Sequence, residues 1–79
     1  MKLMFDAEGM GKKIKHYREQ LGMTRDDLAN AIDYPPYWIE LLEDGYADTD
    51  PRMSAITDIA NVLNIEPSWL LAWKPEDEE

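Results

Sequence analysis

The sequence contains no cysteine and has few basic residues and no long apolar run. Without cysteine there is no disulfide, no thiol nucleophile and no cysteine-ligated zinc, and a reducing compartment suits the chain. No apolar run approaches the roughly 20 residues of a membrane span or the core of a signal peptide. We therefore expect a cytoplasmic protein with no membrane partner. With 79 residues, the chain forms one domain at most.

Basic residues are outnumbered and unevenly placed. Eight basic side chains against 17 acidic ones give a net charge of −9, which repels nucleic acid at long range. Residues 1–25 hold six basic and three acidic residues, a charge of +3, whereas residues 26–79 hold two against fourteen, a charge of −12. The chain is bipolar, so the acidic total does not by itself exclude DNA as a partner.

The apolar spacing predicts an all-α protein, a compact bundle of about five short helices with no strand pattern. The predicted helices cover 10–21, 24–32, 36–44, 51–63 and 68–73, and they are bounded by Gly22, by Thr24 as an N-cap, by Pro35 and Pro36, by Asp50 and Pro51, and by Asn64. Met10, Ile14, Tyr17 and Leu21 form the apolar stripe of the first helix. We expect a domain over 10–73, an N-terminal arm over 1–9 that is flexible or packs on a neighbour, and an acidic tail over 74–79.

Residues 24–44 have the spacing of a helix-turn-helix unit. Leu28, Ile32, Ile39 and Leu42 supply apolar contacts between two short helices, with Ala29 at their crossing. Asp33 stands at the turn, where it tolerates a left-handed backbone.

The order of four segments resembles the Cro/phage-repressor-like family, also called XRE-type helix-turn-helix. The segments are 24–29 (TRDDLA), 42–45 (LEDG), 59–65 (IANVLNI) and 69–71 (WLL). The resemblance implies a five-helix bundle that regulates transcription and binds double-stranded DNA as a homodimer, with the third helix in the major groove.

Carried onto this sequence, the family's DNA-facing positions are Arg25, Pro36, Tyr37, Glu40 and Leu41. The third helix departs from the family because it has no Arg, Lys, Asn, Gln, Ser or Thr to contact bases, although Glu40 can accept a hydrogen bond from cytosine. Further cations are interpreted either as phosphate contacts or as a solvated face, and Arg52 alternatively as the ion-pair partner of Asp48 or Asp50. These cations are Lys12, Lys13, Lys15, Arg18 and Arg52.

Two aromatic groups are candidates for an interface. Tyr34 and Trp38 adjoin the proline pair and would bind a protein partner, unless Trp38 packs on the first helix. Trp69, Leu70 and Trp73 would mediate dimerisation, or else cover a small core.

Neither an enzyme nor a metal or cofactor site is predicted. His16 is the only histidine, and there is no Gly-rich phosphate loop, nucleophile triad or metal pair. Two functions remain: a DNA-binding regulator, or an acidic protein-interaction module on the same fold, such as an antirepressor, an antitoxin-like partner or a DNA mimic.

Overall fold

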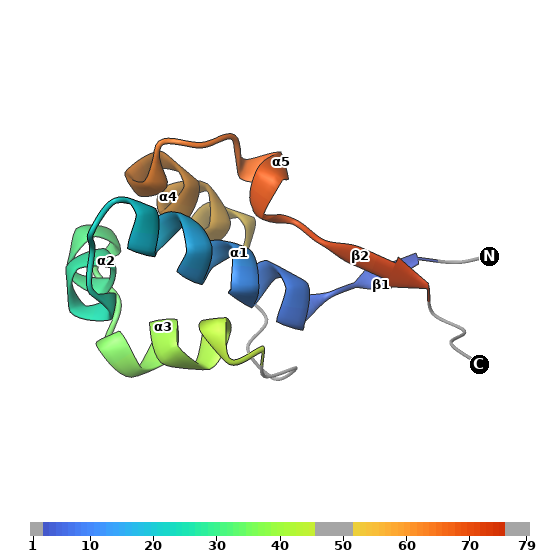
Figure 1. Cartoon of the computed structure of the whole chain (residues 1–79), viewed down its shortest axis with the longest axis horizontal. Helices are drawn as coiled ribbons and strands as arrows, with labels where there is room; N and C mark the ends of the chain where they lie inside the picture. The colour runs from blue at the N-terminus through green and yellow to red at the C-terminus, as the bar shows by residue number, and fades with distance from the viewer. Residues whose placement is uncertain (1–2, 46–51, 76–79) are drawn as a thin grey trace.

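The computed structural model describes residues 3–45 and 52–75 of the chain. Within these residues it forms five helices and two short strands, so the predicted helical bundle is confirmed. The elements, in chain order, are β1 (Leu3–Phe5), α1 (Ala7–Gln20), α2 (Arg25–Ile32), α3 (Pro36–Glu43), α4 (Met53–Leu63), α5 (Pro67–Leu70) and β2 (Trp73–Pro75). In Figure 1 the helices surround α1, and the two strands form a ribbon that extends from one end of the bundle.

One apolar core joins the helices. α1 and α2 both pack on α3, α2 also packs on α4, and α4 packs on α5. The largest fully buried side chains come from all five helices: Met10, Ile14, Leu28, Ile39, Ile59 and Leu70. The core therefore fixes the position of α3 relative to α1 and α2.

The first helix begins earlier and buries a different stripe than the sequence predicted. It starts at Ala7, because the Asp6 side chain accepts a hydrogen bond from the Gly9 amide at 3.0 Å and caps the first turn. Leu21, predicted as core, is 53% exposed. Arg18 takes the buried position one turn earlier, so the predicted stripe is wrong at its end.

Local signals set the ends of α2 and α3 as predicted. Thr24 caps α2 in a reciprocal capping box with Asp27. Asp33 is left-handed with φ of 63°, and Pro36 is the first residue of α3. Gly45 follows α3 with φ of 76°, a conformation that favours glycine.

The boundaries of α4 agree with the prediction at one end. Asn64 is left-handed with φ of 61° and ends the helix. Arg52 occupies the N-cap position with an extended backbone, and Met53 is the first helical residue. The predicted start at 50–51 lies outside the described residues.

The predicted fifth helix over 68–73 is too long, and the prediction of no strand is wrong. α5 ends at Leu70, and the chain becomes extended because Ala72 accepts a hydrogen bond from the Asp6 amide at 2.8 Å. Trp73–Pro75 then pairs antiparallel with Leu3–Phe5. Residues 3–9, predicted as an arm, thus form β1 and the start of α1, and the start of the predicted tail lies in β2.

Candidate nucleic-acid interface

A buried ion pair joins α1 to the end of α3. The Arg18 guanidinium donates to both carboxylate oxygens of Glu43, from Nε at 2.7 Å and from Nη2 at 3.0 Å, and Nη1 donates to the Met23 carbonyl at 2.7 Å. The Glu43 side chain is fully buried, and that of Arg18 is 8% exposed. Hydrogen bonding to Glu43 raises the pKa of Arg18. This pair fixes the C-terminal end of α3 against α1.

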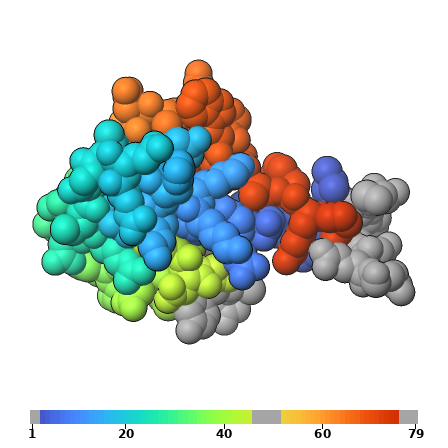
Figure 2. All heavy atoms as spheres, in the orientation of Figure 1, coloured from blue at the N-terminus to red at the C-terminus, as the bar shows by residue number. Residues whose placement is uncertain are grey.

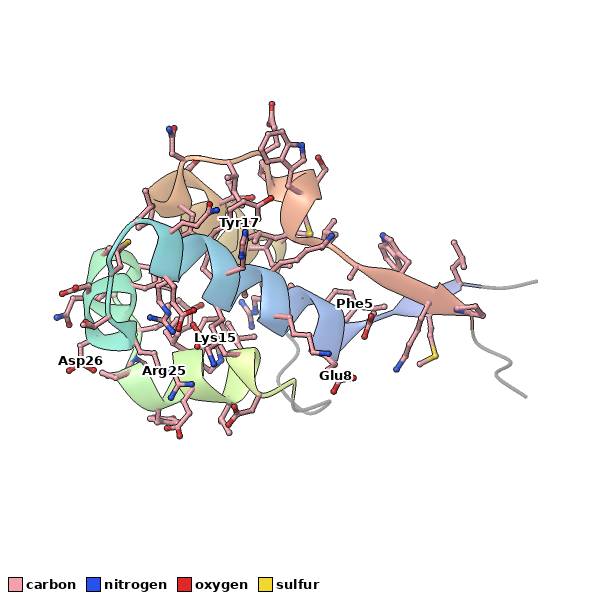
Figure 3. All side chains as sticks on the ribbon, in the orientation of Figure 1. Phe5, Glu8, Lys15, Tyr17, Arg25 and Asp26 are labelled. Atoms are coloured by element: carbon pink, nitrogen blue, oxygen red, sulfur yellow. The ribbon has the colours of Figure 1, made fainter. Side chains whose placement is uncertain are left out.

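Arg25, at the first position of α2, is held by the same carboxylate. Its Nε donates to Glu43 Oε1 at 3.0 Å, and its Nη1 lies 3.8 Å from Glu40 Oε2. A cation is unfavourable at a helix N-terminus, and these two carboxylates of α3 compensate for it. The Arg25 side chain remains 37% exposed beside the C-terminal half of α3 (Figure 3).

One side of the N-terminal half of α3 presents its side chains to solvent, whereas Trp38 and Ile39 face the core. Pro36 and Glu40 are exposed, and Tyr37 is 64% exposed. Leu41 is half-buried. We call the exposed set Arg25, Pro36, Tyr37 and Glu40 the α3 surface. The opposite side of the helix is buried, so a partner that meets α3 must approach this surface.

Gly11 allows α1 to cross α3 closely, a role that the sequence analysis missed. A Cβ atom at this position would collide with the carbonyl oxygens of Leu42 and Glu43. Lys15 and Arg18 follow Gly11 by four and seven residues and share its helix face. Lys15 is therefore an exposed cation on the side of α1 that faces α3 (Figure 3). A glycine inside a strongly predicted helix was the available signal.

The cations of α1 do not form one phosphate-binding edge. Lys12 and Lys15 are exposed, whereas Lys13 donates to the Leu71 carbonyl at 3.0 Å on the side of α5. The interpretation of Arg18 as a phosphate contact needs correction, because its guanidinium is buried in the pair with Glu43. Arg52 is exposed at the start of α4.

The aromatic candidates lie in three separate places. Tyr34 and Trp38 stack with ring centroids 4.1 Å apart and pack, half-buried, against the core. Trp69 is 53% exposed on α5, where it lines a hollow of about 300 Å³, and Trp73 is 57% exposed on β2. Leu70 is fully buried, so its assignment to an interface is corrected to a core role.

Glu43 is the functional neighbour that sequence reasoning passed over. The sequence analysis included it only in the segment 42–45, yet it follows Ile39 by four residues and so lies on the same buried face. Over residues 3–45 and 52–75, no cluster of three or more His, Cys, Asp or Glu side chains is arranged to hold a metal ion. Among the helices that the structure describes, none is long and apolar enough to cross a membrane.

Several solved structures have the same arrangement of helices. The restriction-modification controller protein C.AhdI from Aeromonas hydrophila matches with a TM-score of 0.75 at 23% identity, over 82% of this chain and 96% of that chain. SinR, a master regulator for biofilm formation, matches in its complex with DNA with a TM-score of 0.70 at 23% identity, over 77% and 95% of the two chains.

A SinR/SinI protein complex also matches, with a TM-score of 0.69 at 21% identity, over 77% of this chain and 58% of that chain. No protein-family model and no curated protein sequence matches the chain. The structural likeness confirms the fold that the sequence predicted: the chain has the helix-turn-helix fold of the Cro/phage-repressor type.

Proposed function

We propose that the protein is a DNA-binding transcriptional regulator that places α3 in the major groove. The exposed N-terminal turn of α3 carries this proposal, because a helix-turn-helix protein contacts base edges with that part of its second helix. SinR, whose fold this chain shares, was solved in complex with DNA. As in other helix-turn-helix proteins, a dimer would present two α3 helices to two half-sites.

Three residues of the α3 surface have a role in this proposal, together with three cations outside it. Glu40 accepts a hydrogen bond from cytosine N4, and Tyr37 contacts a thymine methyl group. Four exposed or half-buried cations contact phosphates: Lys12, Lys15, Arg25 and Arg52. Four contacts per protomer give a slope of log affinity against log salt of about −3.6, or roughly a 150-fold loss between about 50 and 200 mM salt.

Fluorescence anisotropy on a labelled pool of random duplexes tests the proposal. The wild-type protein should bind at about 20–50 mM salt, and Lys15→Ala should reduce the salt slope by about 0.9 per protomer. Lys74→Ala, which removes the same charge from the ribbon, is the matched control and should leave the slope unchanged. Absence of binding at this ionic strength would overturn the proposal.

A second function is favoured by the charge of the α2–α3 unit. Residues 25–44 hold one Arg against six carboxylates, five of them exposed, and that Arg contacts Glu40 and the buried Glu43. An acidic surface of this kind is complementary in charge to a basic protein surface, so the alternative function is an acidic protein-interaction module. The SinR/SinI complex contains a protein partner for this fold. No duplex binding by the wild type, together with none by Glu40→Gln, would favour this module over the DNA-binding regulator.

A further inference from the structure

The β1–β2 ribbon is an apolar projection that the helices do not cover. Figures 1 and 2 show it extending beyond the bundle. Leu3 is 63% exposed, Met4 41% and Trp73 57%. Phe5 contacts Trp73 edge to face, with ring centroids 6.0 Å apart. A two-stranded ribbon is marginally stable by itself, and exposed apolar residues gathered on one element indicate contact with a partner.

The hydrogen-bond register shows which backbone groups of the ribbon are unused. Asp6 donates to Ala72, and the two strands pair Met4 with Lys74. Hydrogen-bonded and non-hydrogen-bonded pairs alternate in an antiparallel ladder. Since Asp6 is hydrogen-bonded to Ala72, the next bonded pair is Met4 with Lys74, and the amide and carbonyl groups of Met4 point toward β2. The amide and carbonyl groups of Leu3 and Phe5 therefore point to the outer edge of β1, where no other strand of the described residues pairs.

The two outer edges of the ribbon differ in how strongly they oppose pairing with another strand. On β2, the outward groups belong to Trp73 and Pro75, and proline has no amide to donate. Lys74 adds a charge to the same strand, and both lysine and proline oppose edge-to-edge pairing. β1 consists of Leu3, Met4 and Phe5 and contains neither lysine nor proline. The outer edge of β1 is therefore the edge that can pair with another strand.

We propose that the outer edge of β1 pairs antiparallel with β1 of a second copy of this chain. A two-fold axis at Met4 places Leu3 opposite the partner's Phe5, and two such pairs exchange two backbone hydrogen bonds each. The product is a four-stranded sheet with β1 of each copy at its centre. Leu3 and Phe5 share one face of the strand, so the apolar faces of the two ribbons become continuous.

Charge supports a second copy as the occupant. The chain has a net charge of −9, so most of its surfaces repel a second copy. β1 is uncharged, and pairing about Met4 therefore brings no like charges face to face. A contact between three-residue strands is small, so the dimer is reversible and depends on concentration. The interface would supply the dimer of the proposed function, but its formation requires no DNA.

Sedimentation equilibrium of the full chain between about 1 and 500 µM, spanning weak to moderate affinity, tests this interface. The wild type should pass from 9.2 kDa to twice that mass. Met4→Lys and Met4→Glu each place like charges on the two-fold axis and should remain monomeric. An equimolar mixture of the two variants should restore the dimer, because opposite charges then meet, and this restoration also shows that both variants are folded.

The control separates this interface from one centred on α5. Trp69→Ala removes an exposed aromatic side chain from α5 and should leave dimerisation unchanged. A wild type that stays monomeric, a dimer that survives both Met4 variants, a mixture that fails to dimerise, or a dimer lost in Trp69→Ala would each overturn the proposal. DNA binding is measured separately by anisotropy, so failure of the interface and failure of the proposed function are distinguishable.

Discussion

Replacing Glu43 by Gln is expected to destabilise the fold severely. The wild-type carboxylate accepts three hydrogen bonds from two guanidinium groups, at 2.7, 3.0 and 3.0 Å. Gln keeps the size of the side chain but removes its charge, and its amide NH₂ group presents a donor to guanidinium donors. Arg18, whose side chain is 8% exposed, then keeps only the 58% exposed Glu19 carboxylate, 4.0 Å from its Nη2, as a counter-ion.

The size of the effect follows from this burial. Removing one partner of a buried ion pair costs about 3–5 kcal/mol. A domain of this length has a free energy of unfolding of about 4–12 kcal/mol, from roughly 0.05–0.15 kcal/mol per residue. Because about 1 kcal/mol shifts the Tm of a domain of 60–100 residues by about 4–8 °C, Glu43→Gln should lower the Tm by about 12–40 °C.

Circular dichroism during thermal and urea unfolding measures this change, and Glu40→Gln is the matched control. Glu40 lies 3.8 Å from Arg25 in an ion pair whose carboxylate side chain is 56% exposed. Such a pair contributes about 0–1 kcal/mol, so the control should unfold nearly as the wild type does. A Glu43→Gln variant within about 1 kcal/mol of wild type would refute the structural role assigned to the buried pair.

Three further predictions concern other sites. Gly11→Ala should lower the free energy of unfolding, measured with urea, by about 1–3 kcal/mol, because the added methyl group collides with α3. Alanine is the better helix former, so a gain in stability would contradict the close crossing of α1 and α3. The hydrogen bond from the Thr24 amide lowers the pKa of Asp27 in the folded state. The contribution of Asp27 to stability is therefore present above its unfolded pKa and is lost as the pH falls through its folded pKa. In urea unfolding between about pH 2 and 6, the free energy of unfolding of Asp27→Asn should depend less on pH than that of the wild type. If DNA binding is the function, Glu40→Gln should weaken binding in anisotropy, because the proposed cytosine contact loses its charged acceptor, and should leave the salt slope unchanged, because Arg25 already counts among the phosphate contacts; stronger binding would contradict the base contact proposed for Glu40.

The α2–α3 unit could be predicted from sequence because its signals are local. The Thr24 cap, the left-handed Asp33 and the initial Pro36 act on residues within four positions of themselves. Spacing alone likewise gives most of the core stripes, except at the end of α1, where Arg18 is buried and Leu21 is exposed. The exposed turn of α3 then follows, since Ile39 and Leu42 must face the core.

The ribbon and the use of the cations could not be predicted, because both depend on contacts between distant segments. β1 pairs with residues about 70 positions away, and three residues are too few for an alternating pattern. Arg18 resembles the lysines of α1 in sequence, and only the position of Glu43 on α3 distinguishes it as a buried structural residue. Composition therefore overestimated the cations that are free to bind phosphate.

The central claim, that the α3 surface contacts DNA, is tested most directly by an NMR titration of ¹⁵N-labelled protein with short duplex DNA at low ionic strength. The amide signals of Arg25, Tyr37 and Glu40 should show the largest shifts, with smaller changes along the exposed side of α1. Shifts centred on Trp69 and α5, or no shifts at all, would contradict the claim.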